Sequence, residues 1–352
     1  MADYYDWRKT IAYDADITMV VGERGVGKTY GLRLQLVKDH INNDYNFVEV
    51  VRHKNELSGV ANGYFDRITS NDEFPGKVFM TNNNMAFMAD KPGNDDEKPK
   101  WQLCGYFVAM SQAQQLKKRT FNKVKRIVFD EAILDKRDRY HNYLYHEYEI
   151  LANIVDTVSR ERADVECIHP RVYLLANALD ILNPYFTHYN VGVPKHGYHW
   201  YAGKTFLLHY AKHGDYAKAK ASETVAGRML ANTEGGMVAN DNKFAGLRDD
   251  FVMRKTREAK FSFGIYYDGN AYGVWGDWNN GYYFVTSKIP NNTDKPVYTL
   301  TLEDNRLNYV AARRAEIALS TIADLHYMGC MRYESVSVQE RFRDILRLFG
   351  VR

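Results

Sequence analysis

The chain has 352 residues, which is more than one typical domain holds and suits two domains. Hydrophobic residues make up 45% of the chain and charged residues 26%, and no apolar run approaches the roughly 18 residues of a membrane span. The formal net charge of +3 excludes a globally basic protein, so any contact with nucleic acid must come from a local patch.

Short apolar runs alternate with helical stretches through the first half of the chain. We predict strands at residues 17–21, 46–51, 77–80, 105–110, 126–131 and 171–176, and helices over 28–40 and 145–159. The polar residues 88–100 contain two prolines and are expected to form an exposed loop. This alternation predicts an α/β domain with a mainly parallel sheet over residues 1–210.

The composition changes after Tyr201. Residues 211–243 carry Gly, Ala and charge without a strand pattern, and we interpret them as a linker. Beyond them we predict strands at 260–267, 271–278, 281–286 and 297–302, and helices over 306–321 and 337–349. Turns at Asp268 and Asn279 carry the residues that hairpins require. Residues 244–352 are therefore expected to form a small α+β domain.

The three cysteines (Cys104, Cys167 and Cys330) lie far apart and show no metal-ligand spacing. They predict neither a disulfide framework nor a zinc site, and they favour a reducing, intracellular setting. The first residues lack the apolar region of a secretory signal, so none is expected.

A glycine-rich segment, GERGVGKT, matches the P-loop pattern G-x4-G-K-T between an apolar strand and a helix. The glycines let successive backbone N–H groups face a phosphate, and the helix N-terminus adds partial positive charge. Lys28 can reach the β- and γ-phosphates of ATP, and the Thr29 hydroxyl can hold Mg²⁺. The predicted nucleotide-binding residues are Gly22, Glu23, Arg24, Gly25, Val26, Gly27, Lys28, Thr29 and Tyr30.

A second apolar strand, in the stretch IVFDE, ends at Asp130 and Glu131. The carboxyl ends of such strands are where α/β proteins bind their ligands. We predict that Asp130 binds Mg²⁺ through water and that Glu131 polarises the attacking water. A second carboxylate beyond the metal-binding one indicates hydrolysis rather than binding alone, so the sequence predicts an ATPase.

Further polar residues could complete such a site. Arg160 and Arg162 follow a predicted helix, where an arginine either neutralises the transferring phosphoryl group or is simply solvated. Asn177 follows a strand and could sense the γ-phosphate, or could equally cap a turn.

Two basic stretches could contact a polyanion. Residues 117–126 are rich in Lys and Arg, and a solvated loop or contact with DNA explains them equally well. Arg52 and Lys54 follow the second strand, in a loop that could touch DNA in the pore of a ring.

Together these segments resemble the terminase-like DNA-packaging ATPases of small protein-primed tailed phages, of the Bacillus Salasmaviridae type. That family belongs to the FtsK/HerA-like branch of additional-strand P-loop ATPases. The matching segments spread over nearly the whole chain, and LLANALDILNPYF and KFSFGIYYDGNAYGVW are more specific than the P-loop itself.

The resemblance implies a ring of five copies that uses ATP to translocate double-stranded DNA into a procapsid. It implies the phage portal and procapsid as partners, with the protein in the host cell cytoplasm and transiently at the portal vertex, without a membrane. A structural RNA serves the best-known relative, and the sequence leaves its need here open.

The resemblance also implies roles for single residues. Arg160 matches the family's trans-acting arginine finger, with Arg162 as a close alternate, and Lys117 falls where the family has a second trans-acting basic residue. Asn177 matches the sensor, and Lys54 lies on a pore loop that grips DNA.

The family's C-terminal domain resembles a ribonuclease H-like nuclease without its metal-binding carboxylates. Asp268 and Asp277 are the only acids well placed in the strands for such a site, and no clear acidic triad is evident. We therefore expect a non-catalytic domain that binds nucleic acid or the portal. Three alternatives stay open: a translocase of cellular or plasmid DNA, a terminase-like nuclease, and a nucleotide-binding assembly protein without hydrolysis.

Overall fold

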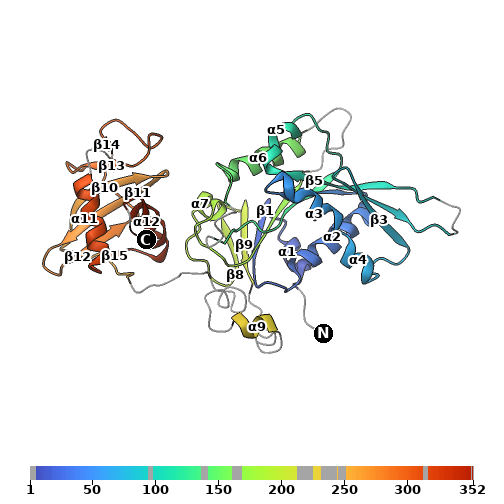
Figure 1. Cartoon of the computed structure of the whole chain (residues 1–352), viewed down its shortest axis with the longest axis horizontal. Helices are drawn as coiled ribbons and strands as arrows, with labels where there is room; N and C mark the ends of the chain where they lie inside the picture. The colour runs from blue at the N-terminus through green and yellow to red at the C-terminus, as the bar shows by residue number, and fades with distance from the viewer. Residues whose placement is uncertain are drawn as a thin grey trace. The chain divides into compact units, whose positions relative to one another are not determined.

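The structure is a computed structural model that describes residues 5–93, 98–135, 142–160, 169–211, 225–230, 244, 251–311, 316–349 and 351. The chain divides into two compact units, Met1–Ala245 and Gly246–Arg352 (Figure 1). Of the predicted linker 211–243, only residue 211 and the helix α9 (Val225–Leu230) are described. Within the described ranges, no helix has the length and apolar character needed to cross a membrane.

The first unit is built on a nine-stranded sheet in the order β3-β4-β5-β2-β6-β7-β1-β9-β8. The strands are β1 (Ile17–Val21), β2 (Asn46–Val51), β3 (Lys77–Asn82), β4 (Met85–Asp90), β5 (Gln102–Ala109), β6 (Val124–Phe129), β7 (Arg171–Ala176), β8 (Gly197–Tyr201) and β9 (Phe206–Tyr210). Pairing is parallel from β5 across to β9, and antiparallel strands stand at both edges. This confirms the predicted mainly parallel α/β fold.

Helices cover both faces of this sheet, and the alternation along its strands decides which face each residue meets. The helical segments are α1 (Trp7–Ala12), α2 (Lys28–Asn43), η1 (Lys54–Glu56), α3 (Leu57–Asn62), α4 (Asp66–Ser70), η2 (Met110–Gln112), α5 (Ala113–Leu116), α6 (Glu147–Val158) and α7 (Pro184–His188). Val128 belongs to the core cluster that includes Leu32 of α2, whereas its neighbour Phe129 contacts Tyr185 of α7 on the other face.

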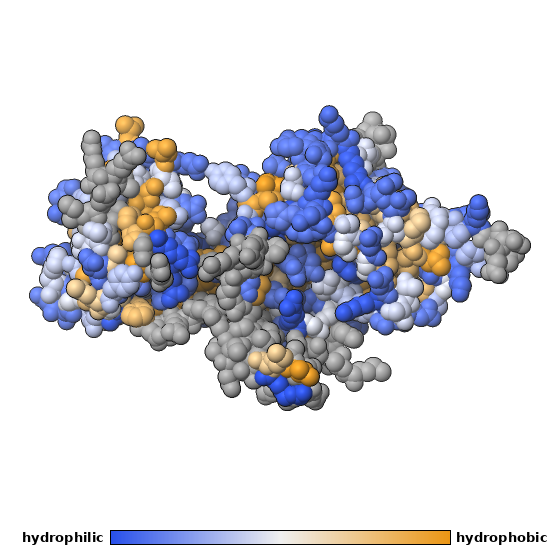
Figure 2. Space-filling model, in the orientation of Figure 1, coloured by the Kyte–Doolittle hydropathy of each residue, from blue (hydrophilic) through white to orange (hydrophobic). Residues whose placement is uncertain are grey.

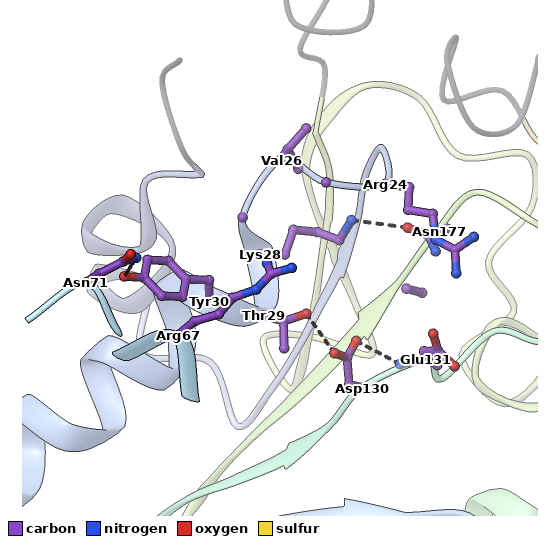
Figure 3. Close-up of a pocket in the computed structure, with 13 residues that line it drawn as sticks. Arg24, Val26, Lys28, Thr29, Tyr30, Arg67, Asn71, Asp130, Glu131 and Asn177 are labelled. Carbon is purple, nitrogen blue, oxygen red and sulfur yellow. Dashed lines mark hydrogen bonds between the residues drawn. The ribbon is translucent and has the colours of Figure 1, made fainter. Parts of the chain in front are cut away.

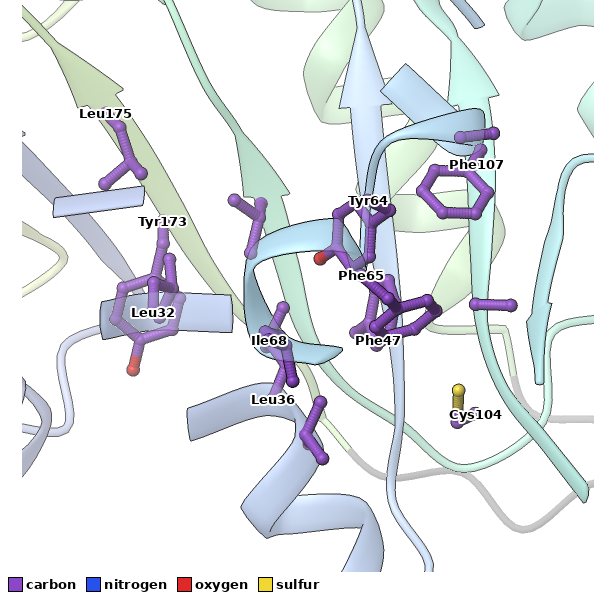
Figure 4. Packing of buried hydrophobic residues seen from close by; sticks show 14 of the residues in the cluster. Leu32, Leu36, Phe47, Tyr64, Phe65, Ile68, Cys104, Phe107, Tyr173 and Leu175 are labelled. Atoms are coloured by element: carbon purple, nitrogen blue, oxygen red, sulfur yellow. The ribbon is translucent and has the colours of Figure 1, made fainter. Parts of the chain in front are cut away.

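The core beneath α2 is aromatic where α3 and α4 meet the sheet (Figure 4). Phe47 of β2 stacks on Tyr64 at 5.2 Å between ring centroids, and Phe107 of β5 meets Tyr64 edge-on at 5.0 Å. Gly105 leaves room for this stack, since a Cβ there would lie 2.4 Å from the Phe47 ring. The segment that carries α3 and α4 is thus anchored on the sheet close to the start of β2.

The predicted bounds of three central strands, 17–21, 46–51 and 171–176, agree with the structure. The predicted loop 88–100 is wrong at its start, because β4 runs to Asp90 in antiparallel pairing with β3. Strands β8 and β9 were not predicted. Their aromatic residues lack strong periodicity, and β9 becomes a strand by pairing with β1.

The second unit contains a six-stranded sheet in the order β14-β13-β10-β11-β12-β15. Its elements are β10 (Lys260–Tyr267), β11 (Asn270–Asp277), β12 (Tyr282–Thr286), β13 (Val297–Thr299), β14 (Val310–Ala311), α11 (Glu316–Tyr327), β15 (Met331–Tyr333) and α12 (Val336–Leu348). Strands β10, β11 and β12 are antiparallel, and β13 and β14 continue parallel from β10. On the other side of the sheet, β15 pairs in parallel with β12.

Two predictions for the second unit have different outcomes. The hairpin at Asp268 is confirmed, because Asp268 (φ 48°) and Gly269 (φ 70°) both take the left-handed conformation of a type I′ turn. The helix predicted over 306–321 is wrong in position. Residues 310–311 pair as β14 with β13, and α11 begins only at Glu316.

Candidate nucleotide-binding site

A pocket of about 560 Å³ opens where β1, β6 and β7 end, a size suited to a small ligand (Figure 3). It is lined by Arg24, Gly25, Val26, Gly27, Lys28, Thr29, Tyr30, Arg67, Asn71, Asp130, Glu131, Ala176 and Asn177. The fold thus brings together the predicted glycine-rich loop, the acid pair and Asn177. Gly22 and Glu23 do not line the pocket.

The glycine-rich loop is shaped for an anion. Gly25 (φ 91°) and Gly27 (φ 81°) take conformations that other residues rarely adopt. Gly27 caps α2 without a side-chain hydrogen bond, so the first N–H groups of the helix are directed toward the pocket. The Lys28 ammonium donates to the carbonyl oxygens of Gly22 (2.9 Å) and Glu23 (2.7 Å), which hold it at the mouth of the loop.

The adjacent side chains converge on the same point. Lys28 Nζ also donates, at 3.3 Å, to Oδ1 of Asn177, the residue that follows β7. Thr29 Oγ1 donates to Asp130 Oδ2 at 2.6 Å, and the Glu131 N–H donates to Asp130 Oδ1 at 2.8 Å. Both oxygens of the Asp130 carboxylate are therefore held in place (Figure 3).

Glu131 has a left-handed backbone (φ 55°), which is uncommon for a residue with a long side chain. Such conformations cluster at functional sites, where the surrounding structure enforces them. Here the Ala132 N–H donates to the carbonyl of Leu175 at 2.9 Å and fastens the turn to β7.

The donor set fits Mg²⁺, which prefers oxygen ligands and takes one or two from the protein together with phosphate oxygens. Thr29 and Asp130 supply a hydroxyl and a carboxylate oxygen 2.6 Å apart. Among the described residues, no group of three or more His, Cys, Asp or Glu could hold a metal by itself. For Mg²⁺ held by Thr29 and Asp130, phosphate oxygens and water would supply the remaining ligands.

Arg52 corrects one prediction. Its side chain is only 5% exposed and pairs with the buried Glu147 carboxylate at 2.8 Å, so it does not contact DNA. Successive side chains along a strand point to opposite faces of the sheet. Val51, the last residue of β2, packs in the cluster beneath α2, so Arg52, the next residue, points to the opposite face. There its guanidinium donates to the carbonyls of Glu131 and Ala132, at 3.4 and 3.2 Å. Lys54 is exposed, and its backbone N–H donates to Ser111 Oγ at 3.1 Å.

Two of the predicted trans-acting residues, Arg160 and Lys117, do not line the pocket of their own chain. Arg160 is exposed beyond α6 and pairs with Asp156 at 3.0 Å. Lys117 is exposed directly after α5. The surface over α5 and α6 is largely hydrophilic (Figure 2). Arg162 lies outside the described residues.

Three pocket residues were missed by sequence reasoning: Ala176, the last residue of β7, and the pair Arg67 and Asn71. Arg67 and Asn71 reach the pocket from the short helix α4 and the residue that follows it. Asn71 Nδ2 donates to the Tyr30 hydroxyl at 2.8 Å, and that hydroxyl donates to Glu73. No local motif in this segment indicates a ligand, so only the tertiary contact with α2 could reveal it.

The two acids noted in the sequence of the second unit, Asp277 and Asp268, occupy structural positions. Asp277 accepts hydrogen bonds from Thr256 Oγ1 (2.6 Å) and from the Asn280 side chain (2.9 Å). Asp268 occupies the first position of the β10–β11 turn. Neither arrangement favours the nuclease alternative.

In the first sheet, β7 lies between β6 and β1, so the strands that lead to the acid pair and to the glycine-rich loop are not neighbours. This sheet and the loop that ends at Lys28 and Thr29 define an additional-strand P-loop ATPase fold. The chain belongs to the podovirus DNA encapsidation protein (Gp16) family, whose model matches residues 1–349. The resemblance found from the motifs is thereby confirmed.

The chain is similar to individual relatives over most of its length and most of theirs. The chain is 30% identical over 346 residues to the DNA packaging protein of Bacillus phage PZA, covering 98% of this chain and 97% of that one. It is 31% identical over 294 residues to the DNA packaging protein of Bacillus phage B103, covering 84% of each. It also resembles a chain of the bacteriophage phi-29 viral genome packaging motor assembly, with a TM-score of 0.73, 26% identity and coverage of 98% and 99%.

Proposed function

We propose that this chain is the ATP-hydrolysing motor that packages double-stranded viral DNA into a procapsid. One observation carries the proposal: in one pocket beside Glu131, Lys28 donates a hydrogen bond to Asn177 and Thr29 donates one to Asp130. Membership in the encapsidation family supplies the substrate, since the pocket alone does not distinguish among ATPases.

The chain's own residues divide the work at the nucleotide. The loop amides and Lys28 bind the β- and γ-phosphates, while Thr29 and Asp130 hold Mg²⁺. When bound, Mg²⁺ neutralises charge on the phosphate oxygens. Glu131 orients the attacking water and accepts its proton, and Asn177 contacts the γ-phosphate. Arg24 and Tyr30, on either side of the loop, line the remaining wall of the nucleotide site.

A neighbouring copy completes the site in this proposal. Arg160 is exposed and does not line the pocket of its own chain. Both properties are required of a residue that serves an adjacent subunit. It stabilises the transferring phosphoryl group of the neighbour, with Arg162 as the alternate and Lys117 as a second cation. Such sharing requires a homo-oligomeric ring, and the family resemblance favours five subunits.

The remaining partners follow from the packaging role. Lys54, exposed after β2, grips DNA phosphates, a contact that is insensitive to sequence and weakened by salt. Residues 1–210 form the motor domain and 211–243 the linker. Residues 244–352 bind nucleic acid or the portal, with a structural RNA as a further partner. The motor acts in the host cytoplasm, transiently at the portal vertex.

The decisive experiment measures ATP hydrolysis with DNA and procapsids. Glu131→Gln should lower hydrolysis about 10²-fold or more while ATP binding remains, because the base is removed and the phosphate site is not. An unchanged rate would refute the assignment of Glu131.

Complementation tests the shared site. Arg160→Ala and Lys28→Ala subunits are each expected to be inactive. Their mixture should regain activity where Arg160 of a Lys28→Ala subunit reaches the intact glycine-rich loop of an Arg160→Ala subunit. Mixtures that stay inactive under assembly conditions would count against a trans-acting Arg160.

A further inference from the structure

Arg67 is a cation in the nucleotide pocket that no local motif indicates. It lies on α4 and lines the pocket together with Lys28 and Thr29. Its side chain points from α4 toward Thr29 (Figure 3). Within the part of the chain that the structure describes, its guanidinium makes no hydrogen bond or ion pair, and its backbone carbonyl accepts one from the Ser70 hydroxyl.

The helix that carries Arg67 is firmly placed. Ile68, the next residue, is 1% exposed and packs in the core cluster beneath α2. Asn71 and Glu73 both hydrogen-bond to the hydroxyl of Tyr30, which directly follows the Lys-Thr pair of the loop. Arg67 therefore projects from a backbone that is fastened to the phosphate-binding helix, unlike an arginine on a mobile surface loop.

The charges in the pocket leave Arg67 available for an anion. Both acids that line the pocket belong to the turn after β6. Asp130 is engaged by Thr29 and by the Glu131 N–H. Arg67 pairs with neither acid, although an arginine is well suited to bind an oxyanion with two parallel hydrogen bonds.

We infer that Arg67 binds the triphosphate of the nucleotide held by its own chain, at the β–γ end. The end is assigned because Arg67 approaches from the side of Thr29, and in P-loop proteins that hydroxyl and its metal lie beside the β- and γ-phosphates. The inference rests on the proposed function of the pocket. It makes Arg67 a residue that distinguishes ATP from ADP.

The test measures the affinity of the full chain for fluorescent ATP and ADP analogues in the presence of Mg²⁺. Arg67→Ala should weaken ATP binding about tenfold, ~1.4 kcal/mol, and ADP binding less than about threefold. Arg67→Lys should retain part of the preference, since it keeps the charge and loses the paired hydrogen bonds. Arg257→Ala, an exposed arginine of the second unit, serves as the charge-matched control and should change neither affinity.

Two outcomes would overturn the inference: unchanged affinity for both nucleotides in Arg67→Ala, or an equal loss for both. Lys28→Ala separates this failure from failure of the site. If Lys28→Ala loses ATP and Arg67→Ala does not, the site stands and the role of Arg67 is wrong. If Lys28→Ala binds ATP normally, the proposed function of the pocket fails as well. A melting temperature for Arg67→Ala equal to that of Arg257→Ala shows that both variants are folded.

Discussion

Replacing Glu147 with alanine should destabilise the first unit strongly, because this carboxylate is the buried partner of Arg52. The Glu147 side chain is fully buried. It accepts hydrogen bonds from Arg52 Nε (2.8 Å), Arg52 Nη2 (3.0 Å), the Tyr185 hydroxyl (2.8 Å) and the Leu144 N–H (3.0 Å). Burial raises the pKa of Tyr185 well above its usual range, so the phenol remains a neutral donor.

The magnitude follows from what remains after the substitution. Arg52 would keep its charge in a buried position without its carboxylate, which costs about 3–5 kcal/mol. In a unit of this size, each kcal/mol shifts the melting temperature by roughly 2–4 °C, so a fall of roughly 6–20 °C is expected. Asp90→Asn is the control. Asp90 pairs with Lys77 at 2.5 Å but is 84% exposed, and such surface pairs contribute about 0–1 kcal/mol.

Thermal unfolding of both variants, followed by near-ultraviolet circular dichroism at pH 7.5, measures the difference. The double variant Arg52→Met/Glu147→Leu should recover much of the loss, because it removes both charges together. If Glu147→Ala melts within about 4 °C of Asp90→Asn, the Arg52–Glu147 ion pair does not contribute the expected stability to the first unit.

Three further predictions concern packing, titration and the site. Gly105→Ala should cost about 1–3 kcal/mol in urea unfolding, since the new Cβ would lie 2.4 Å from the Phe47 ring, whereas Gly59→Ala, with open space around it, should not destabilise. Burial raises the pKa of Glu49 from 4.5 to about 7, so the folded state retains this proton more tightly than the unfolded state. The stability of the parent relative to Glu49→Gln should therefore fall as pH rises from 4.5 to 7, and parallel pH profiles would contradict this. Asn177→Ala should lower ATP hydrolysis at least about tenfold while nucleotide affinity changes little, and an unchanged hydrolysis rate would remove Asn177 from the site.

The sequence by itself determined the glycine-rich loop and the acid pair. The loop, the strand before it and the helix after it are continuous in the chain, so their chemistry follows from the order of residues 17–43. Asp130 and Glu131 likewise directly follow a strand whose apolar run is evident without any partner, although that strand ends at Phe129 and not at Glu131 as predicted. The residues in the stretch NPYF and in the second unit identified the family for the same reason, since both are local patterns.

Only the tertiary structure decided which residues meet across the chain. Asn177 reaches Lys28 because β7 is inserted beside β1, an order that no local pattern encodes. Two arginines show that local sequence does not decide the role of a charged side chain. Arg52 was predicted to contact DNA, but it pairs with Glu147 in the interior. Arg67 was not noticed in the sequence, but it lines the pocket. The physical reason is that a charged side chain's role depends on which face of the sheet it meets and what carboxylate or phosphate site lies there, and long-range packing sets both.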